Sequence, residues 1–345
     1  MRIKLKVASF FCGCGGSDLG VLGGFDYLTQ SYSSLPFEIN YALDFDKYAV
    51  ETYNANFEHP AVCEDIKNVN IDEINQFDLL IGGFPCQSFS TVNPNKDTND
   101  DRANLYKELV KILNIKQPKF FIAENVKGLM TLQKGEILQK VITEFEAVGY
   151  KVKYKLLLAS NFGIPQKRER LFIVGVRNDL NIDYNFPENT HSELELFDKK
   201  PWNPLGTVIK NLEIEDKKYY FSQKAVEGMK NAKQNMKRGL YQDLGKQCLT
   251  ITSHLAKTSL NSRDPVLLVN PEKEIYRRFT PTEAAAIQSF PQNFVYPVSE
   301  TQAYKQIGNA IPPVLMWNVA KSLVNSIGQD EFRVLKKRIE VLEEV

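Results

Sequence analysis

The chain has 345 residues, of which 43% are hydrophobic, so it can bury the core of one large domain and a smaller one. Its formal net charge of +1 excludes a global field that would drive it onto nucleic acid or membrane. The five cysteines form no CxxC pair and no zinc spacing with the three histidines, so we expect free thiols, a cytoplasmic setting and no metal. No apolar run approaches membrane-spanning length, and we expect no membrane partner.

The first predicted strand covers residues 5–11 and leads into a glycine-rich turn with Gly13, Gly15 and Gly16. Such a turn between strand and helix lets a ligand approach the backbone and points helix N–H groups at it. A dinucleotide fingerprint would need a third glycine where this chain has Asp18. The turn therefore favours a nucleoside ligand without a pyrophosphate, the alternative being a tight turn without a ligand.

A second strand is predicted over residues 38–43 and is closed by Asp44. An acidic residue at this place typically holds ribose hydroxyls. The alternative role is the N-cap of the helix predicted over 47–57, and one carboxylate could serve both. A short third strand around 61–63 ends at Asp65 and Ile66.

An apolar run at 77–81 predicts a buried strand, which the two glycines at 82 and 83 are expected to end. Pro85 and Cys86 then lie at the crevice where open α/β sheets bind ligands. Most free cysteines are small buried hydrophobes, but that does not explain the polar residues that follow Cys86. We interpret Cys86 as a nucleophile, and the polar loop 91–101 as either a plain surface loop or a lid over the thiol.

A helix is predicted over 105–115, and a buried strand over 119–123 ends in Glu124 and Asn125. A carboxylate at that strand end would share the crevice with Cys86, the alternative being a helix or turn cap. A helix over 137–148 and strands over 151–158 and 171–176 follow. The alternating charges of 166–170 would, taken alone, indicate a solvated surface turn.

This β-α alternation predicts an α/β fold with a mainly parallel sheet and helices on both faces. The pattern stops near Pro187, and residues 189–273 are polar, lysine-rich and interspersed with aromatic side chains. That composition suits a nucleic-acid surface, although solvated lysines are the usual alternative. Two further helices are predicted, one capped by Thr280 or Thr282 and one over 306–322.

Taken together, these motifs resemble those of the DNA (cytosine-5)-methyltransferases. The likeness covers roughly residues 5–180 and 275–323, with the family's motifs in order. They are Phe11-x-Gly13-x-Gly15-Gly16, Phe84-Pro85-Cys86-Gln87, Glu124-Asn125-Val126, Gln166-x-Arg168-x-Arg170, the segment 277–291, and Gln306-Ile307-Gly308-Asn309-Ala310. Two departures touch the first motif: Ser9 stands where many members have Asp, and Ser17 where an apolar residue is usual.

The resemblance implies a Rossmann-like, S-adenosylmethionine-dependent methyltransferase sheet with a second, smaller, irregular target recognition domain. It assigns residues 1–188 to catalysis and cofactor binding and 189–273 to target recognition. Residues 274–325 would carry the final motifs, with the last helix returning to the catalytic domain. The apolar spacing of the tail indicates an amphipathic helix over 326–345.

The resemblance also implies a chemical role for each motif. Cys86 would add to C6 of a flipped-out cytosine, Glu124 would contact its N3 edge, and Arg168 and Arg170 would stabilise the thiolate and the adduct. Pro85 would fix the nucleophile loop and Asn125 would support the site. The implied contacts of S-adenosylmethionine are Phe11, Gly13, Gly15, Gly16, Asp44, Phe45, Asp65, Ile66, Leu105 and Asn309.

The implied partner is double-stranded DNA, bound by a monomer, and a cognate restriction endonuclease is a candidate second partner. One alternative is a tRNA cytosine-5 methyltransferase of the same architecture, against which the length of 189–273 argues. Another is a catalytically inactive DNA-binding regulator, which the intact Cys86, Glu124 and Arg170 disfavour. A thiol hydrolase would need a histidine base near Cys86, and no histidine lies at the carboxyl end of a predicted core strand.

Overall fold

The computed structural model describes residues 4–85, 105–194, 197–233, 241–257 and 265–328. The predicted nucleophile Cys86, the loop 91–101 and most of the predicted C-terminal helix lie outside these ranges. Within them, no helix is both long enough and apolar enough to cross a membrane.

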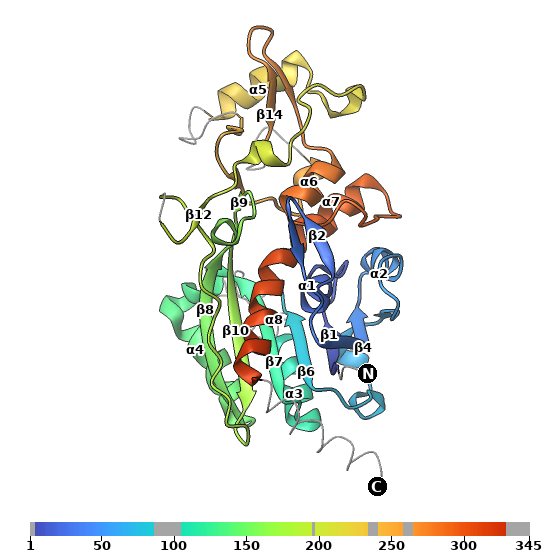
Figure 1. The fold of residues 1–345 in the computed structure, drawn as a ribbon. Coiled ribbons are helices and arrows are strands. Elements are labelled where there is room, and N and C mark those ends of the chain that lie inside the picture. The colour runs from blue at the N-terminus through green and yellow to red at the C-terminus, as the bar shows by residue number, and fades with distance from the viewer. Residues whose placement is uncertain (1–3, 86–104, 195–196, 234–240, 258–264, 329–345) are drawn as a thin grey trace.

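A seven-stranded sheet in the order β5-β4-β1-β6-β7-β10-β8 forms the centre of the molecule (Figure 1). Its strands are β1 (Leu5–Phe10), β4 (Phe37–Asp44), β5 (Val62–Cys63), β6 (Leu79–Gly83), β7 (Phe120–Val126), β8 (Tyr150–Leu158) and β10 (Glu169–Arg177). The first five strands in this order pair in parallel, whereas β10 is antiparallel to both β7 and β8. The predicted mainly parallel sheet is therefore confirmed.

Helices cover both faces of the sheet because both faces of its central strands are apolar. On one face, α1 (Gly16–Leu22) and α8 (Pro313–Ile327) pack on alternate strand residues such as Val7 and Ile81. On the other, α3 (Leu105–Lys116) and α4 (Glu136–Ala147) pack on the intervening residues, such as Ala8 and Leu80. The helix α2 (Lys47–Asn54) packs beside β4 through Tyr53.

A hairpin of β2 (Phe25–Tyr27) and β3 (Gln30–Tyr32) lies between α1 and β4 in the chain. Its strands have three residues each, and the sequence pattern did not predict them. The hydroxyl of Tyr27 donates to the carbonyl of Ala286 at 2.8 Å. This bond joins the hairpin to α6 (Pro281–Ile287), a helix far along the chain.

The region after the sheet consists of short elements, and Figure 1 shows α5 and β14 at the end of the molecule opposite α3. It contains β11 (His191–Ser192), β12 (Lys200–Pro201), α5 (Gln223–Lys233), β13 (Cys248–Leu249), β14 (Leu267–Asn270) and β15 (Ile275–Arg277). One strand of it, β13, pairs with β9 (Gln166–Lys167), directly before β10. The predicted boundary at residue 273 falls in the β14–β15 turn, and the division into functional domains stays a prediction.

Short 3-10 helices connect many of these elements. They are Ile66–Asn68, Ile71–Glu73, Lys127–Met130, Leu132–Gly135, Ala159–Phe162, Leu205–Thr207, Lys217–Tyr219 and Leu255–Lys257.

The helix predicted over 306–322 is wrong as a single element. The structure has α7 (Glu300–Asn309) and α8, with an extended link between them. Pro312 and Pro313 cause the break, because proline disfavours helical backbone at the residue before it and cannot donate to the helix ladder. For the helix before α7, the structure selects Thr280 as N-cap: its hydroxyl accepts from the Glu283 amide, and Glu283 bonds back to the Thr280 amide.

Gly20 marks the crossing of α1 and α8. A Cβ placed there would lie 2.6 Å from both the Cβ of Met316 and the carbonyl oxygen of Pro313. We predict that Gly20→Ala lowers the free energy of unfolding by about 1–3 kcal/mol, since overpacking a filled core forces its helices apart. Urea denaturation measures this, with Gly128→Ala as control because its nearest contact is at 3.8 Å. Equal losses in the two variants would contradict the prediction.

Candidate active site

The order of the sheet brings the predicted site residues to one edge. The carboxyl ends of β4, β1, β6 and β7 are neighbours there, and the strand register places Phe10 beside Gly82 and Gly83 beside Glu124. The connections reverse direction between β1 and β6, and such a switch point opens a ligand crevice in an α/β sheet. Most predicted cofactor residues thus end or follow β1, β4 and β5, whereas Leu105 begins α3 and Asn309 ends α7. Of the predicted catalytic residues, Pro85 follows β6, Glu124 and Asn125 lie on β7, Arg170 lies on β10, and Arg168 lies between β9 and β10.

Glu124 and Arg170 form a nearly buried ion pair at this edge. The Arg170 Nε donates to the Glu124 Oε1 at 2.8 Å, and the two side chains are only 11% and 12% exposed. Burial raises the pKa of Glu124, and the nearby Arg170 and Arg168 oppose that rise. Glu124 lies within β7 rather than at a strand end as predicted, because β10 pairs with β7 beyond it.

The two glycines of β6 leave room for this pair. They were expected to end the strand, but β6 continues through Gly83, and its parallel ladder with β7 includes both glycines. A Cβ on Gly83 would lie 3.3 Å from the Glu124 Oε2, and one on Gly82 would lie 3.3 Å from the Phe10 carbonyl oxygen. Glycine therefore lets the carboxylate lie close against the neighbouring strand.

The charged segment 166–170 is not a solvated turn. Its residues alternate with the period of a strand, so Gln166 and Arg168 are fully buried while Lys167 points outward. The Arg168 guanidinium donates to the carbonyls of Ile251 (2.9 Å), Gly308 (2.8 Å) and Ala310 (3.0 Å). The two arginines therefore differ: Arg168 holds main-chain carbonyls, and Arg170 holds the carboxylate.

Asn125 fixes the chain that leads to Cys86. Its Nδ2 donates to the Phe84 carbonyl at 2.9 Å, and its Oδ1 accepts from the Val126 amide at 2.8 Å. The side chain is buried, and the neighbouring Pro85 is half-buried. The segment is thereby tied to β7 one residue before Pro85, and the position of Cys86 itself lies outside the described residues.

Asp44 joins the glycine-rich turn to the turn before α2. Its Oδ2 accepts from the Gly13 amide at 2.8 Å, and its Oδ1 accepts from the Asp46 amide at 2.9 Å. The cap of α2 is Asp46, which accepts from the Tyr48 amide, so the cap alternative for Asp44 is wrong. Burial raises the pKa of Asp44, and its unused lone pairs can accept bonds from hydroxyl groups.

The surroundings of Asp44 are open on one side. Phe45 is 73% exposed, and a Cβ on Gly13 would meet no atom within 4 Å. In contrast, a Cβ on Gly15 would lie 2.1 Å from the Phe57 ring, and one on Gly16 would lie 2.5 Å from the Ile311 carbonyl oxygen. Glycine is thus needed at 15 and 16 for protein packing, and free space lies beside Gly13.

The remaining predicted cofactor residues lie around the same edge. Asp65 is exposed and caps the 3-10 helix Ile66–Asn68 by accepting from the Lys67 amide, while Ile66 is buried. Leu105 is half-buried at the start of α3, and Asn309 is exposed at the end of α7. Phe11 is half-buried directly after β1.

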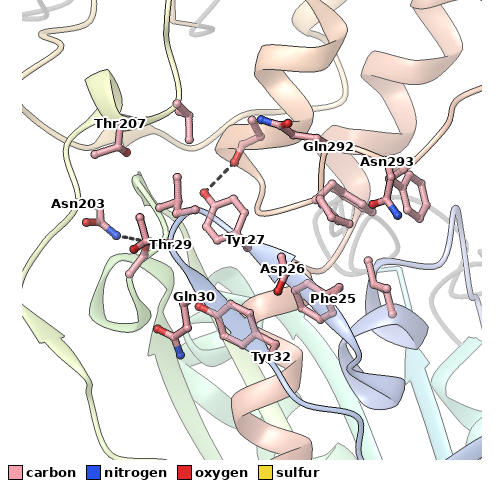
Figure 2. A pocket seen from close by; sticks show the side chains of 18 of the residues that line it. Phe25, Asp26, Tyr27, Thr29, Gln30, Tyr32, Asn203, Thr207, Gln292 and Asn293 are labelled. Carbon is pink, nitrogen blue, oxygen red and sulfur yellow. Dashed lines mark hydrogen bonds between the residues drawn. The ribbon is translucent and has the colours of Figure 1, made fainter.

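A cleft of about 920 Å³ lies away from these residues (Figure 2). The hairpin β2–β3 forms one wall with Asp26, Thr29 and Gln30, and Asn203 and Thr207 stand across from it. None of the predicted site residues lines it. Sequence reasoning missed this cleft because the hairpin that builds it has no clear pattern.

Several lysines of residues 189–273 are paired with acidic side chains and so are less available to bind nucleic acid than the composition suggested. Lys218 pairs with Asp216 and with Glu300, and Lys230 pairs with Glu274. Lys199 and Lys246 also lie near Asp198 and Asp243, so four of the described lysines expected to make a basic surface have acidic partners.

Asp18 occupies a role that the sequence did not reveal. It is fully buried, and its carboxylate accepts bonds from the hydroxyls of Ser9 (3.0 Å), Ser17 (2.9 Å) and Tyr53 (3.0 Å). Burial raises its pKa to about 6. The serines at positions 9 and 17, which depart from the resembled pattern, were the available signal for this cluster.

Nearly the whole chain is similar to known DNA methyltransferases. A family model described as C-5 cytosine-specific DNA methylase matches residues 5–325. Type II methyltransferase M.NgoFVII of Neisseria gonorrhoeae is 34% identical, with 93% of this chain and 87% of that protein covered. Type II methyltransferase M.FnuDI of Fusobacterium nucleatum is 33% identical, with 97% of this chain and 98% of that protein covered.

The fold is similar to that of a solved DNMT2 variant from Spodoptera frugiperda. The TM-score is 0.70 at 20% sequence identity, with 93% of this chain and 100% of that chain covered. This likeness concerns the fold alone and confirms the predicted Rossmann-like methyltransferase architecture.

The raised pKa of Asp18 makes stability depend on pH. A carboxyl with a pKa of about 6 when folded and 3.8 when unfolded favours folding in its protonated form. Its contribution is fully present below pH 3.8 and is lost as pH rises through 6, by about 3 kcal/mol in total. We predict that Asp18→Asn removes this loss between pH 4.5 and 7, as measured by urea unfolding at both pH values. An unchanged pH dependence in the variant would contradict it.

Proposed function

The chain belongs to the C-5 cytosine-specific DNA methylase family, and from this membership we propose how its own residues carry out the reaction. The family methylates cytosine at C5 in DNA, and the chain is an enzyme of this class. The observation that supports the assignment of residues is the Glu124–Arg170 pair, which lies beside the segment that leads to Cys86.

Cytosine C5 is a poor nucleophile, so the reaction needs covalent activation. We assign that step to Cys86, whose thiolate would add to C6 and turn the ring into an enamine with a nucleophilic C5. S-adenosylmethionine, when bound, supplies an electrophilic methyl group, which would pass to C5 as its bond to the sulfonium sulfur breaks and that sulfur leaves as a neutral thioether. Loss of the C5 proton to a base or an ordered water then expels the Cys86 sulfur and restores the ring. Because C5 and C6 lie within the base stack, the cytosine must first be flipped out of the duplex.

Glu124 is suited to contact the N3 and amino edge of the flipped base. Addition at C6 places charge on N3, which a carboxyl group can relieve by donating a proton. Burial raises the Glu124 pKa in the required direction, and Arg170 keeps the group oriented. Arg168 would contribute a second positive charge near Glu124, while its hydrogen bonds hold the main chain at Ile251 and Gly308.

The methyl donor fits the open side of the Asp44 region. Two ribose hydroxyls could bond to the remaining lone pairs of the Asp44 carboxylate, whose other lone pairs hold Gly13 and Asp46. The exposed Phe45 and the half-buried Phe11 offer aromatic faces to an adenine, and the free space at Gly13 admits the chain of the donor. The other assigned contacts are Gly15, Gly16, Asp65, Ile66, Leu105 and Asn309.

Target recognition is assigned to residues 189–273, because the assigned catalytic residues lie elsewhere and base readout needs contacts of its own. We propose a monomer that acts on double-stranded DNA in the cytoplasm, where the reducing environment keeps Cys86 a thiol. A cognate restriction endonuclease fits the Type II names of the relatives. The tRNA alternative and the inactive-regulator alternative predict no methylated DNA.

A covalent trap tests the mechanism. Bisulfite sequencing of DNA from expressing cells first maps the target, with tRNA from the same cells as comparison. Duplex DNA with 5-fluorocytosine at that target, together with S-adenosylmethionine, should then link irreversibly to Cys86. Addition and methyl transfer can proceed, but fluorine cannot leave as a cation, so the sulfur–carbon bond persists.

Cys86→Ser is the matched control for the trap, because it should bind the same duplex without forming a denaturation-resistant band. A band that maps to Cys12, Cys14, Cys63 or Cys248 would remove Cys86 from its assigned role. No band, on DNA whose unfluorinated form is methylated, would refute the addition–elimination mechanism.

Asp44→Ala tests the donor site. We expect weaker binding of S-adenosylmethionine by about 1.5–3 kcal/mol, because hydrogen bonds to a charged acceptor are lost, with DNA binding changed less. Isothermal titration calorimetry measures the donor affinity. Asp46→Ala is the control, since it removes the cap of α2 and the ion pair with Lys305 but leaves Asp44 in place. Unchanged donor affinity in Asp44→Ala would exclude Asp44 from the site.

A further inference from the structure

The loop between β1 and α1 has an unfavourable backbone. Phe11, Gly13 and Gly15 all have positive φ values, of 56°, 56° and 93°. Glycine adopts this region freely, but a phenylalanine does so only at a cost. Such strain persists where the surrounding structure over-determines the conformation, and it concentrates at ligand sites. Contacts with neighbouring elements must therefore hold the loop in this conformation.

Asp18 joins the two ends of this loop from behind. Ser9 lies on β1, two residues before Phe11, and Asp18 lies in the first turn of α1, after Gly15. The bond from the Ser9 hydroxyl to the Asp18 Oδ2, at 3.0 Å, thus closes the loop at its base. The Tyr53 hydroxyl reaches the Asp18 Oδ1 from α2, also at 3.0 Å. One carboxylate therefore connects β1, α1 and α2.

The Tyr53 contact extends to the tip of the loop. Its ring stacks on that of Phe57 with centroids 4.4 Å apart, and the Phe57 ring fills the place that a Cβ on Gly15 would take. On the other side, the Cys12 amide donates to the Leu43 carbonyl at 3.0 Å, and the Gly13 amide donates to Asp44. The loop is held between the Asp18 cluster and the Asp44 turn.

We propose that Asp18 is a positioning residue for the methyl donor: through Ser9 and Tyr53 it holds the loop 11–15 in the conformation that receives the donor. The inference rests on the proposed function, in which this loop and Asp44 bind S-adenosylmethionine. Asp18 is fully buried, so it acts through the loop rather than by touching the ligand.

A carboxylate suits this task better than other side chains. It only accepts hydrogen bonds and offers about four lone pairs, so it can hold three hydroxyls at once. Bonds to a charged acceptor are also the stronger ones. The first turn of α1 adds N-terminal helix N–H groups, which favour negative charge. Cys12 and Cys14 are further titratable groups near it.

Deleting single hydroxyls separates positioning from general stability. Ser9→Ala and Tyr53→Phe each remove a bond that joins Asp18 to another element. Ser17→Ala removes a bond of similar length, 2.9 Å, but Ser17 is the neighbour of Asp18 on the same helix and joins nothing. We expect the dissociation constant of S-adenosylmethionine to rise at least fivefold in Ser9→Ala and Tyr53→Phe, and less than twofold in Ser17→Ala.

Calorimetry with S-adenosylmethionine on the full chain gives these constants, and binding of a duplex oligonucleotide is measured in parallel. Affinity for the duplex should stay within twofold in all three variants. The inference is overturned if Ser17→Ala weakens donor binding as much as the other two, or if none of the three changes it. A wild-type chain that does not bind S-adenosylmethionine would instead overturn the proposed donor site, and the inference with it.

Asp78→Asn supplies a second control for loss of a buried carboxylate. Asp78 is 7% exposed, and it accepts from the Lys6 amide and pairs with Lys119, at the opposite end of β6 from the site. The variant Asp78→Asn should lower thermal stability without changing the dissociation constant of S-adenosylmethionine. If it weakens donor binding as much as Tyr53→Phe does, the Asp18 effect is one of stability alone and the inference fails.

Discussion

The buried guanidinium of Arg168 is the constraint on which the arrangement of the site depends. It donates to carbonyls of Ile251, Gly308 and Ala310, which lie 83, 140 and 142 residues further along the chain. A buried cation without partners would be very costly, so these segments must converge on it when the chain folds. Two residues further on, in β10, Arg170 bonds to Glu124. The segment 166–170 therefore both brings distant parts of the chain together and orients the Glu124 carboxylate.

Close main-chain approaches accompany this convergence. Gln166, also fully buried, donates to the side chain of Gln288 at 2.6 Å and accepts from the Ile251 amide at 2.9 Å. A Cβ on Gly308 would lie 2.2 Å from the carbonyl carbon of Thr252. Buried amides and a glycine thus let α7 and the 248–252 segment meet at the base of the site. A segment within the proposed target recognition region is in this way fixed directly to Arg168, a proposed catalytic residue.

Three carboxylates lie at or behind this edge of the sheet, Asp18 and Glu124 buried and Asp44 half-buried, and their partners differ in kind. Asp18 has three hydroxyl donors, Asp44 has two backbone amides, and Glu124 has a guanidinium. Burial raises the pKa of each. Hydroxyl partners suit the structural role proposed for Asp18, amide partners leave lone pairs for the ligand proposed at Asp44, and a cation beside Glu124 suits the proton transfer proposed there. The type of partner thus matches the three roles that we propose for one functional group.

The sequence by itself determined the elements of the sheet, the edge at which the candidate site residues gather, and the family. Apolar runs such as 77–81 and 119–123 encode their strands locally, and motif residues such as Glu124 follow from those strands at short range. The break at Pro312 and Pro313 was also encoded locally, although the predicted helix ran through it. Only the tertiary structure decided that β10 enters the sheet antiparallel, that Arg168 and Arg170 have separate partners, and that Asp18 holds Ser9 and Tyr53. The physical reason is that a buried polar side chain must be satisfied, and its partners come from whichever segments the packing of the helices and the sheet brings to it.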